Sequence, residues 1–289
     1  MNTQPENHCL LTFDIEEWFQ VENLKGAIRK SDWESRKSSV NQNTAVILDI
    51  LNEYNVKGTF FVLGWIAERY PELVEKISRA GHEVACHGDN HDLTYILKED
   101  ELLEDIQKSK STLEGIIGKK VSGYRAPSFS VDDRVLNILK KLDFRYDSSF
   151  NPFKLNKRYG HIDGNLAKVS NGCYRTRQGI YEIPISVVPL LNYNFPIGGG
   201  AYFRILPARV FRNLVKRKIA IDNVYSFYLH PWEFEPGQER IKNIKLNYRF
   251  RHYYGLSRTR SRFEKFIEYL KGQDCRFLNL AEYVNQFQD

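Results

Sequence analysis

Short apolar runs and amphipathic stretches alternate along most of the 289-residue chain. The runs are rich in β-branched and aromatic residues, as buried strands are. The stretches between them repeat apolar residues three and four positions apart, as one face of a helix does. Repeated strand–helix units predict an α/β fold with a parallel sheet covered by helices. The predicted strands span residues 9–13, 57–63, 82–86, 123–125, 144–146, 181–183 and 224–229.

The predicted helices carry start and stop signals at their ends. The helix over 44–54 has Asn43 available as an N-cap, and the next one has Pro71 in its first turn. A long amphipathic helix closes at Gly118, a residue that helix ends favour. The remaining predicted helices span residues 71–79, 102–117, 132–142, 207–218, 258–271 and 280–287.

The composition is that of one folded globular domain. Hydrophobic residues make up 42% of the chain and aromatic residues 13%, and no low-complexity segment or linker interrupts the pattern. We therefore expect a single domain over residues 1–289. The glycines at 198–200 lack the spacing and the lysine of a phosphate-binding loop, so nucleotide binding is not expected, and no feature indicates a nucleic-acid partner.

The chain is basic, with a net charge of +6 and a pI of about 9.0. Its cationic residues are scattered, with local density at 216–218 and 249–262. Such clusters are ordinary solvated faces, or they contact an anionic glycan, a lipid phosphate or a membrane surface. Both readings stay open, and the sequence does not indicate an oligomeric state.

Cysteine usage and the chain start bear on location. The four cysteines form no CxxC pair, and Cys9 and Cys86 lie in apolar runs, which predicts buried thiols. Residues 1–7 are polar and lack the basic and apolar segments of a secretory signal. No apolar run approaches the roughly 20 residues that a membrane helix needs. These features predict a cytoplasmic protein.

Candidate chemistry gathers at the predicted carboxyl ends of strands. Asp14 and Glu16 follow the first apolar run, and His87 and His91 follow the third. Histidines four apart can share one face of a helical turn. Two imidazoles and a carboxylate form a catalytic divalent-metal site with open positions for water. Metal-assisted hydrolysis is therefore indicated.

Two further residues follow predicted strands in the same way, Arg125 and His230. In a barrel of parallel strands, functional residues collect at this end of the sheet. The ordered series of motifs resembles the polysaccharide deacetylases of the NodB-homology group, carbohydrate esterase family four, and most of all the branch associated with bacterial exopolysaccharide clusters and exosortase systems. The motifs are TFDIEEWF (12–19), HGDNH (87–91), GYRAPSFSV (123–131), YEIPIS (181–186), GGGAYFRILP (198–207), FYLHPWEFEP (227–236) and RFRHYYGLSRT (249–259).

The resemblance implies a distorted (β/α)7-type barrel of the NodB kind with a family-specific C-terminal extension. It also implies that Asp14 is the catalytic base and that His87 and His91 bind the metal. Where most of the family has adjacent aspartates, this chain has Asp-Ile-Glu. Alternation along a strand puts Glu16 on the same side as Asp14, which favours Glu16 over Glu17 as the third ligand.

The later motifs supply the rest of the implied machinery. Arg125 orients the base, the backbone N–H of Ser128 stabilises the oxyanion, and His230 is the general acid. The usual aspartate of the fourth motif is absent, and Glu182 is its nearest counterpart. Aromatic rings beside the motifs can stack on sugars. The candidate substrate-binding residues are Trp18, Phe129, Trp232 and Glu182.

The implied reaction is metal-dependent removal of N-acetyl groups from an amino-sugar polysaccharide or its lipid-linked precursor, with release of acetate, in exopolysaccharide biosynthesis. Zn²⁺ suits the ligand set best, and Co²⁺, Ni²⁺ or Mn²⁺ can also be bound. A cytoplasmic enzyme would meet a lipid-linked sugar at the inner membrane face. Two alternatives remain: a catalytically silent glycan-binding or assembly protein, and a metal-independent amidohydrolase on a small non-sugar amide.

Overall fold

The structure is a computed structural model that describes residues 6–153, 158–162, 166–190 and 193–287. A ten-stranded sheet forms its centre, with the order β11-β1-β2-β3-β4-β5-β8-β7-β6 and with β12 paired to the start of β1. A separate hairpin joins β9 (Val187–Leu190) to β10 (Tyr193–Pro196). The strands of the sheet are β1 (Asn7–Ile15), β2 (Thr59–Val62), β3 (Glu83–Cys86), β4 (Gly123–Tyr124), β5 (Tyr146–Asp147), β6 (Ala167–Ser170), β7 (Cys173–Arg175), β8 (Tyr181–Glu182), β11 (Val224–Leu229) and β12 (Cys275–Phe277).

Among the described residues, the seven neighbouring strands from β11 to β8 run parallel to one another. At the far edge, β7 and β6 add antiparallel pairs. The sheet stays open, because β11 and β6 are its two edges. The predicted α/β class and (β/α)7-type arrangement are confirmed.

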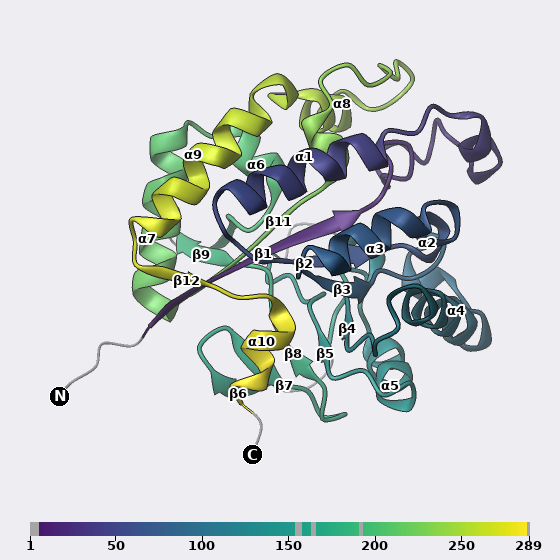
Figure 1. Cartoon of the computed structure of the whole chain (residues 1–289), viewed down its shortest axis with the longest axis horizontal. Coiled ribbons are helices and arrows are strands. Elements are labelled where there is room, and N and C mark those ends of the chain that lie inside the picture. Colours follow the sequence, from purple (N-terminus) through teal and green to yellow (C-terminus); the bar gives the residue numbers. More distant parts are fainter. Residues whose placement is uncertain (1–5, 154–157, 163–165, 191–192, 288–289) are drawn as a thin grey trace.

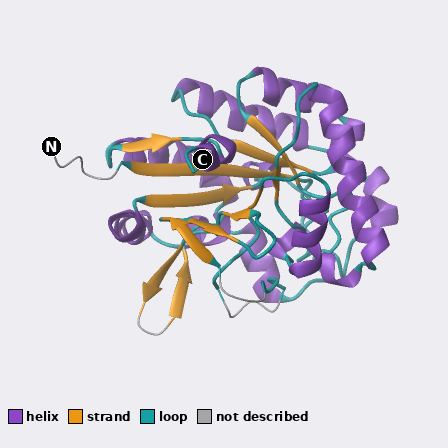
Figure 2. Ribbon diagram, turned by 90° about the horizontal axis from the view of Figure 1, so that it is seen from below, coloured by secondary structure: helices purple, strands orange, loops and turns teal. Residues whose placement is uncertain are grey.

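Helices cover the sheet in both views (Figures 1 and 2). Five short 3-10 turns lie between them, η1 (Lys30–Ser35), η2 (Thr94–Ile96), η3 (Pro127–Phe129), η4 (Pro231–Phe234) and η5 (Leu256–Arg258). The helices are α1 (Val40–Glu53), α2 (Gly64–Arg69), α3 (Pro71–Arg79), α4 (Glu99–Ile117), α5 (Asp133–Lys141), α6 (Gly200–Ile205), α7 (Ala208–Asp222), α8 (Leu246–Tyr253), α9 (Thr259–Lys271) and α10 (Leu280–Asn285).

The start of α1 differs from its prediction. The helix begins at Val40, so Asn43 lies inside its first turn and Ser39 is the N-cap. The side chain that caps this helix comes from another segment of the chain. The Glu17 carboxylate accepts hydrogen bonds from the backbone N–H groups of Ser39 and Val40 at 3.1 and 3.2 Å. A carboxylate at a helix N-terminus satisfies unpaired N–H groups and interacts favourably with the helix dipole.

Several short elements were not predicted. They include the strands β6, β7, β9, β10 and β12 and the helices α2, α6 and α8. Each has eight residues or fewer, and β6 and β10 are largely exposed. These segments are therefore too short to show the apolar repeat of a helix or of a strand.

Two further predictions concerned the burial of the cysteines and the absence of a membrane-spanning helix. Cys9, Cys86 and Cys173 are buried, Cys275 is half-buried, and all four are free thiols. Of the helices in the described ranges, none is both long and apolar enough to cross a bilayer.

A buried histidine at the start of β3 makes stability depend on pH. His82 Nδ1 accepts a hydrogen bond from Gly58 N–H at 3.3 Å, and burial, aided by Lys57, lowers the pKa of His82 to about 4. Only the unfolded chain then takes up this proton between pH 6.5 and 4. We expect the free energy of unfolding to fall by about 2 kcal/mol as the pH drops through this window.

Replacement by glutamine tests this prediction. His82→Gln keeps an acceptor for Gly58 and removes the titration, so denaturant unfolding should show a smaller pH dependence in the variant than in the wild type. An equally steep loss of stability in His82→Gln would show that other groups cause it.

Candidate active site

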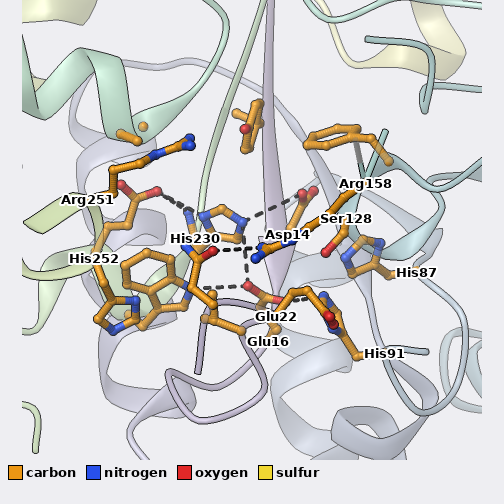
Figure 3. A pocket seen from close by; sticks show the side chains of 18 of the residues that line it. Asp14, Glu16, Glu22, His87, His91, Ser128, Arg158, His230, Arg251 and His252 are labelled. Atoms are coloured by element: carbon orange, nitrogen blue, oxygen red, sulfur yellow. Dashed lines mark hydrogen bonds and ion pairs between the residues drawn. The ribbon is translucent and has the colours of Figure 1, made fainter. Parts of the chain in front are cut away.

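A cavity of about 120 Å³ opens at the carboxyl ends of the parallel strands. Asp14 lies near the end of β1, and His87 and His230 directly follow β3 and β11. Residues from distant parts of the chain therefore meet at one edge of the sheet, and Figure 3 shows their side chains gathered around one space. The predicted site residues that line this cavity are Asp14, Glu16, His87, His91, Ser128, Phe129, His230 and Trp232.

One carboxylate and two imidazoles form a candidate metal centre. Glu16, His87 and His91 offer ligand atoms that all lie within 4.8 Å of one another. Glu16 Oε2 is buried and lies 2.7 Å from His91 Nε2. His87 Nδ1 donates to the carbonyl oxygen of Arg125 at 2.8 Å, which leaves the lone pair on Nε2. Trp232 Nε1 donates to Glu16 Oε1 at 3.1 Å and orients that carboxylate. This donor set fits a divalent ion.

The charges in this group suit metal binding. Burial alone would raise the pKa of Glu16, but the three neighbouring histidines outweigh it and lower the pKa to about 2. Burial lowers the pKa of His87 to about 4. An ionised carboxylate and a neutral imidazole are the forms that bind a metal.

The loop that carries the two histidines is not a helical turn, which corrects the predicted geometry. Gly88 and His91 have left-handed φ angles of 76° and 52°. Asp105, on α4, accepts hydrogen bonds from the backbone N–H groups of Asp89 and Asn90 at 2.9 and 3.2 Å. A Cβ on Gly88 would lie 2.8 Å from Asp105 Oδ2. The histidines therefore come together because α4 holds a tight loop.

A fully buried arginine lies behind the cavity wall. Arg125 Nη1 donates to Asp14 Oδ1 at 2.7 Å and to Thr12 Oγ1 at 2.8 Å. Its Nε and Nη2 donate to the carbonyl and hydroxyl oxygens of Ser148, both at 2.9 Å. Its guanidinium also stacks on Phe61, 4.1 Å from the ring centroid. Arg125 thus holds Asp14 in one orientation.

His230 lies between three carboxylates. Its Nδ1 is 2.9 Å from Glu233 Oε1, and its Nε2 is 3.5 Å from Glu16 Oε1 and 3.9 Å from Asp14 Oδ2. Glu233 Oε2 in turn accepts a 2.6 Å hydrogen bond from Arg204 Nε. The chain Arg204–Glu233–His230 fixes the ring with Nε2 directed at the other two carboxylates (Figure 3).

The three carboxylates around His230 also set its protonation state. Burial would lower the pKa of His230, but Glu16, Glu233 and Asp14 outweigh it and raise the pKa to about 9. Burial would raise the pKa of Glu233, but Arg204 and His230 lower it overall. His230 is therefore an imidazolium paired with a carboxylate at neutral pH.

The third motif forms an unusual turn at the cavity. Ser128 and Phe129 both have left-handed φ angles, 53° and 60°, which non-glycine residues rarely adopt. Phe129 packs edge-on against Tyr228 and Tyr159, with ring centroids 4.9 and 5.6 Å away. The turn places Ser128 and one face of an aromatic wall at the cavity.

Two predicted substrate-binding residues do not reach the cavity. Trp18 is 2% exposed in the core, where its Nε1 donates to the carbonyl oxygen of Lys37 at 3.3 Å. Glu182 is fully buried on β8, where it pairs in register with Asp147 and accepts a hydrogen bond from Phe150 N–H at 3.0 Å. Their positions do not support the predicted roles in binding a sugar.

Sequence reasoning missed Glu233 and Arg204. Glu233 lies three residues after His230, so its reach to the histidine was readable from the spacing. Arg204 lies in the motif at 198–207, but nothing in the sequence indicates that it pairs with Glu233, 29 residues later. Arg251, from the basic stretch at 249–262 that the sequence offered as a phosphate contact, lies on α8 and lines the cavity.

Residues 1–146 match the family model described as polysaccharide deacetylase, and residues 148–285 match a domain of unknown function, DUF3473. The first match covers half of the chain, so the chain belongs to the polysaccharide deacetylase family.

Relatives and solved structures agree with this assignment. The chain is 37% identical over 84 residues to a peptidoglycan-N-acetylglucosamine deacetylase of Bacillus cereus, a match covering 29% of this chain and 30% of that protein. It is 27% identical over 124 residues to a peptidoglycan-N-acetylmuramic acid deacetylase of Bacillus subtilis, covering 42% and 47%. It thus spans less than half the length of these relatives.

A solved structure extends the likeness over the whole fold. A Mycobacterium smegmatis protein assigned as a polysaccharide deacetylase superposes with a TM-score of 0.63 at 19% identity, covering 99% of this chain and 92% of that one. The fold is therefore the NodB-like fold of this family.

The buried pair behind His230 can be tested by unfolding. Arg204 and Glu233 side chains are each 1% exposed. We expect Arg204→Met or Glu233→Gln alone to lower the free energy of unfolding by about 3–5 kcal/mol, because each leaves a buried charge without its partner. The double variant should lose less than the sum of the two.

The exposed pair Arg36–Glu239 is a matched control, with side chains 24% and 53% exposed. Its removal should cost less than about 1 kcal/mol. Additive losses at Arg204 and Glu233 in denaturant unfolding would contradict the coupling.

Proposed function

We propose that the chain removes N-acetyl groups from an amino-sugar polymer by hydrolysis and releases acetate, with a divalent metal held by Glu16, His87 and His91. The observation that carries this proposal is the meeting of that ligand set with Asp14 and His230 in one cavity. A proton acceptor and a proton donor thus flank the same space.

A divalent ion held there, with zinc the best match to the ligands, would supply Lewis-acid polarisation of the amide carbonyl and a water of lowered pKa. Asp14, held by Arg125, accepts the proton from the attacking water. The backbone N–H of Ser128 is the proposed donor to the oxyanion. His230, held by Glu233, protonates the departing amine, since an amide nitrogen does not leave as an anion.

The substrate is a finer part of the proposal. The deacetylase relatives are named for peptidoglycan sugars, which supports an N-acetylated glycan. We place this enzyme in exopolysaccharide biosynthesis, in the branch tied to exosortase systems, acting in the cytoplasm at the inner membrane face on a lipid-linked precursor. Arg251 supports a phosphate in the substrate. It lines the cavity, and within the described part of the chain its side chain forms no ion pair.

The metal centre is tested by elemental analysis and acetate release on the same samples. We expect stoichiometric metal in the wild type and release of acetate from N-acetylated chito-oligosaccharides. The variant His87→Ala/His91→Ala should lose both the metal and the acetate release. Glu16→Gln should also lose metal. Glu17→Gln is the matched control and should keep it, because Glu17 caps α1 instead.

Each alternative has its own result. Absence of metal from the wild type and from the variant would favour the metal-independent amidohydrolase on a small non-sugar amide, or the silent glycan-binding protein. Asp14→Asn should lower kcat by a factor of about 10²–10⁴. If a biological assay of polymer production were unaffected by Asp14→Asn, the silent glycan-binding protein would be favoured.

The proposed phosphate contact predicts a split between substrates. Arg251→Gln should raise KM for a diphosphate-linked N-acetyl sugar about tenfold, the loss of one charge-assisted hydrogen bond, and leave KM for neutral chito-oligosaccharides unchanged. Arg249→Gln, exposed on the same helix, is the control. Equal effects of Arg251→Gln on both substrates would contradict the contact.

A further inference from the structure

A second, strongly basic cavity lies where α6, α7 and α9 meet, elements that lie close together in Figure 1. Its volume is about 180 Å³, and no acidic residue is among those that line it. Its cationic lining residues are Arg212, Arg258, Arg262 and Lys265, and its apolar floor is formed by Phe203, Phe211 and Phe266.

The four cations lack carboxylate partners. In the described ranges of the chain, none of them forms an ion pair. Nearby Glu264 pairs with Arg260 instead. Exposed arginines elsewhere do pair, as Arg69 does with Glu34. Four uncompensated positive charges around one apolar cavity repel one another, so the arrangement costs stability unless an anion joins it.

The contacts of the arginines hold them in place without neutralising them. Arg262 Nη2 donates to the carbonyl oxygen of Leu206 at 2.6 Å, and Arg212 Nη2 donates to that of Lys265 at 2.8 Å. The Arg262 guanidinium lies over the ring of Phe203, 4.9 Å from its centroid. The guanidinium groups of Arg262 and Arg212 are therefore held at the cavity before any ligand arrives, which lowers the entropy lost on binding.

Arg262 carries the clearest sign of a missing partner. Its Nε is buried and has no hydrogen-bond partner among the residues that the structure describes. Burial, followed by the neighbouring charges of Arg258 and Arg212, lowers the pKa of Arg262. A buried donor on a cation is costly to leave unpaired, so Arg262 adds to the uncompensated positive charge beside the cavity.

The chemistry of the lining indicates the ligand. Guanidinium groups bind phosphate oxygens in bidentate pairs, and a phosphate offers several acceptors to several cations at once. The phenylalanine floor suits an apolar group next to the phosphate. We propose that this cavity binds the phosphate or diphosphate group of a ligand that carries an apolar moiety.

This site is separate from the candidate active site. The two cavities share no lining residue. Helix α6 lies between them, since Gly200, Ala201 and Arg204 line the first cavity and Phe203 lines the second. The proposal therefore does not depend on the deacetylase activity.

Calorimetry on the full chain tests the proposal with geranyl diphosphate and inorganic diphosphate as probes. We expect one geranyl diphosphate per chain, bound more tightly than inorganic diphosphate because of the apolar floor. Arg262→Gln and the exposed double variant Arg258→Gln/Lys265→Gln should each weaken binding at least tenfold. The double variant guards against misfolding, since both side chains are exposed.

Two controls place the bound probe. Arg217→Gln, exposed on α7 outside the cavity, should bind as the wild type does. Arg251→Gln reports on the other cavity, so a loss of binding in that variant would place the diphosphate in the active site and overturn the proposal. Failure of both probes to bind at millimolar concentration would also overturn it.

Vesicles distinguish the source of the phosphate. Sedimentation with vesicles of phosphatidylcholine and phosphatidic acid that depends on Arg258 and Lys265 would identify a lipid headgroup. Binding of geranyl diphosphate alone, with the same dependence on these residues, would identify a soluble phosphate ester. Probe binding that none of the cavity variants alters would refute the site.

Discussion

The buried guanidinium of Arg125 is the constraint on which the site depends. It is fully inaccessible to solvent and is bound to Asp14, Thr12 and Ser148. A buried charge is tolerated only when it is paired and hydrogen-bonded. The carboxyl ends of β1, β4 and β5 must therefore converge on it. The backbone carbonyl of Arg125 also accepts a hydrogen bond from His87 Nδ1–H, so one residue orients both the proposed base and one candidate metal ligand.

The rest of the site repeats this device of compensated charge. Arg204 and Glu233 form a second buried ion pair. Glu233 orients His230 in this pair, as Arg125 orients Asp14 in the first. Across the site the charges of Arg125, Arg204 and His230 balance those of Asp14, Glu16 and Glu233, so these side chains can stay ionised although they are largely buried. Arg251 also lines the cavity. Among the described residues its guanidinium group has no carboxylate partner, and it faces the space left for a substrate.

The boundary between the two family matches is not a boundary in the structure. The first match ends at residue 146, within β5, and the second begins at residue 148, directly after that strand. Strand β11, from the second segment, pairs in parallel with β1 from the first. His230 and Glu233 come from the second segment and complete a cavity whose candidate metal ligands come from the first. The segment of unknown function therefore supplies part of the candidate active-site cavity.

Much of this protein was determined by local patterns in its sequence. Helix α3 and strand β11 have their predicted bounds, and Asp14, Glu16, His87, His91 and His230 meet as expected, because strand ends of a parallel sheet share one edge. Short elements such as α6 and α8 escaped prediction, since they contain too few turns to show a period.

Only the tertiary structure decided which partners these residues have. Trp18 and Trp232 each lie in a motif that carries candidate catalytic residues. In the structure, however, Trp18 is in the core and Trp232 orients Glu16. The pairing of Glu233 with Arg204 likewise joins positions 29 residues apart. Periodicity and spacing report on neighbours within a few residues, whereas the burial and pairing of charge depend on segments that meet only in the folded chain.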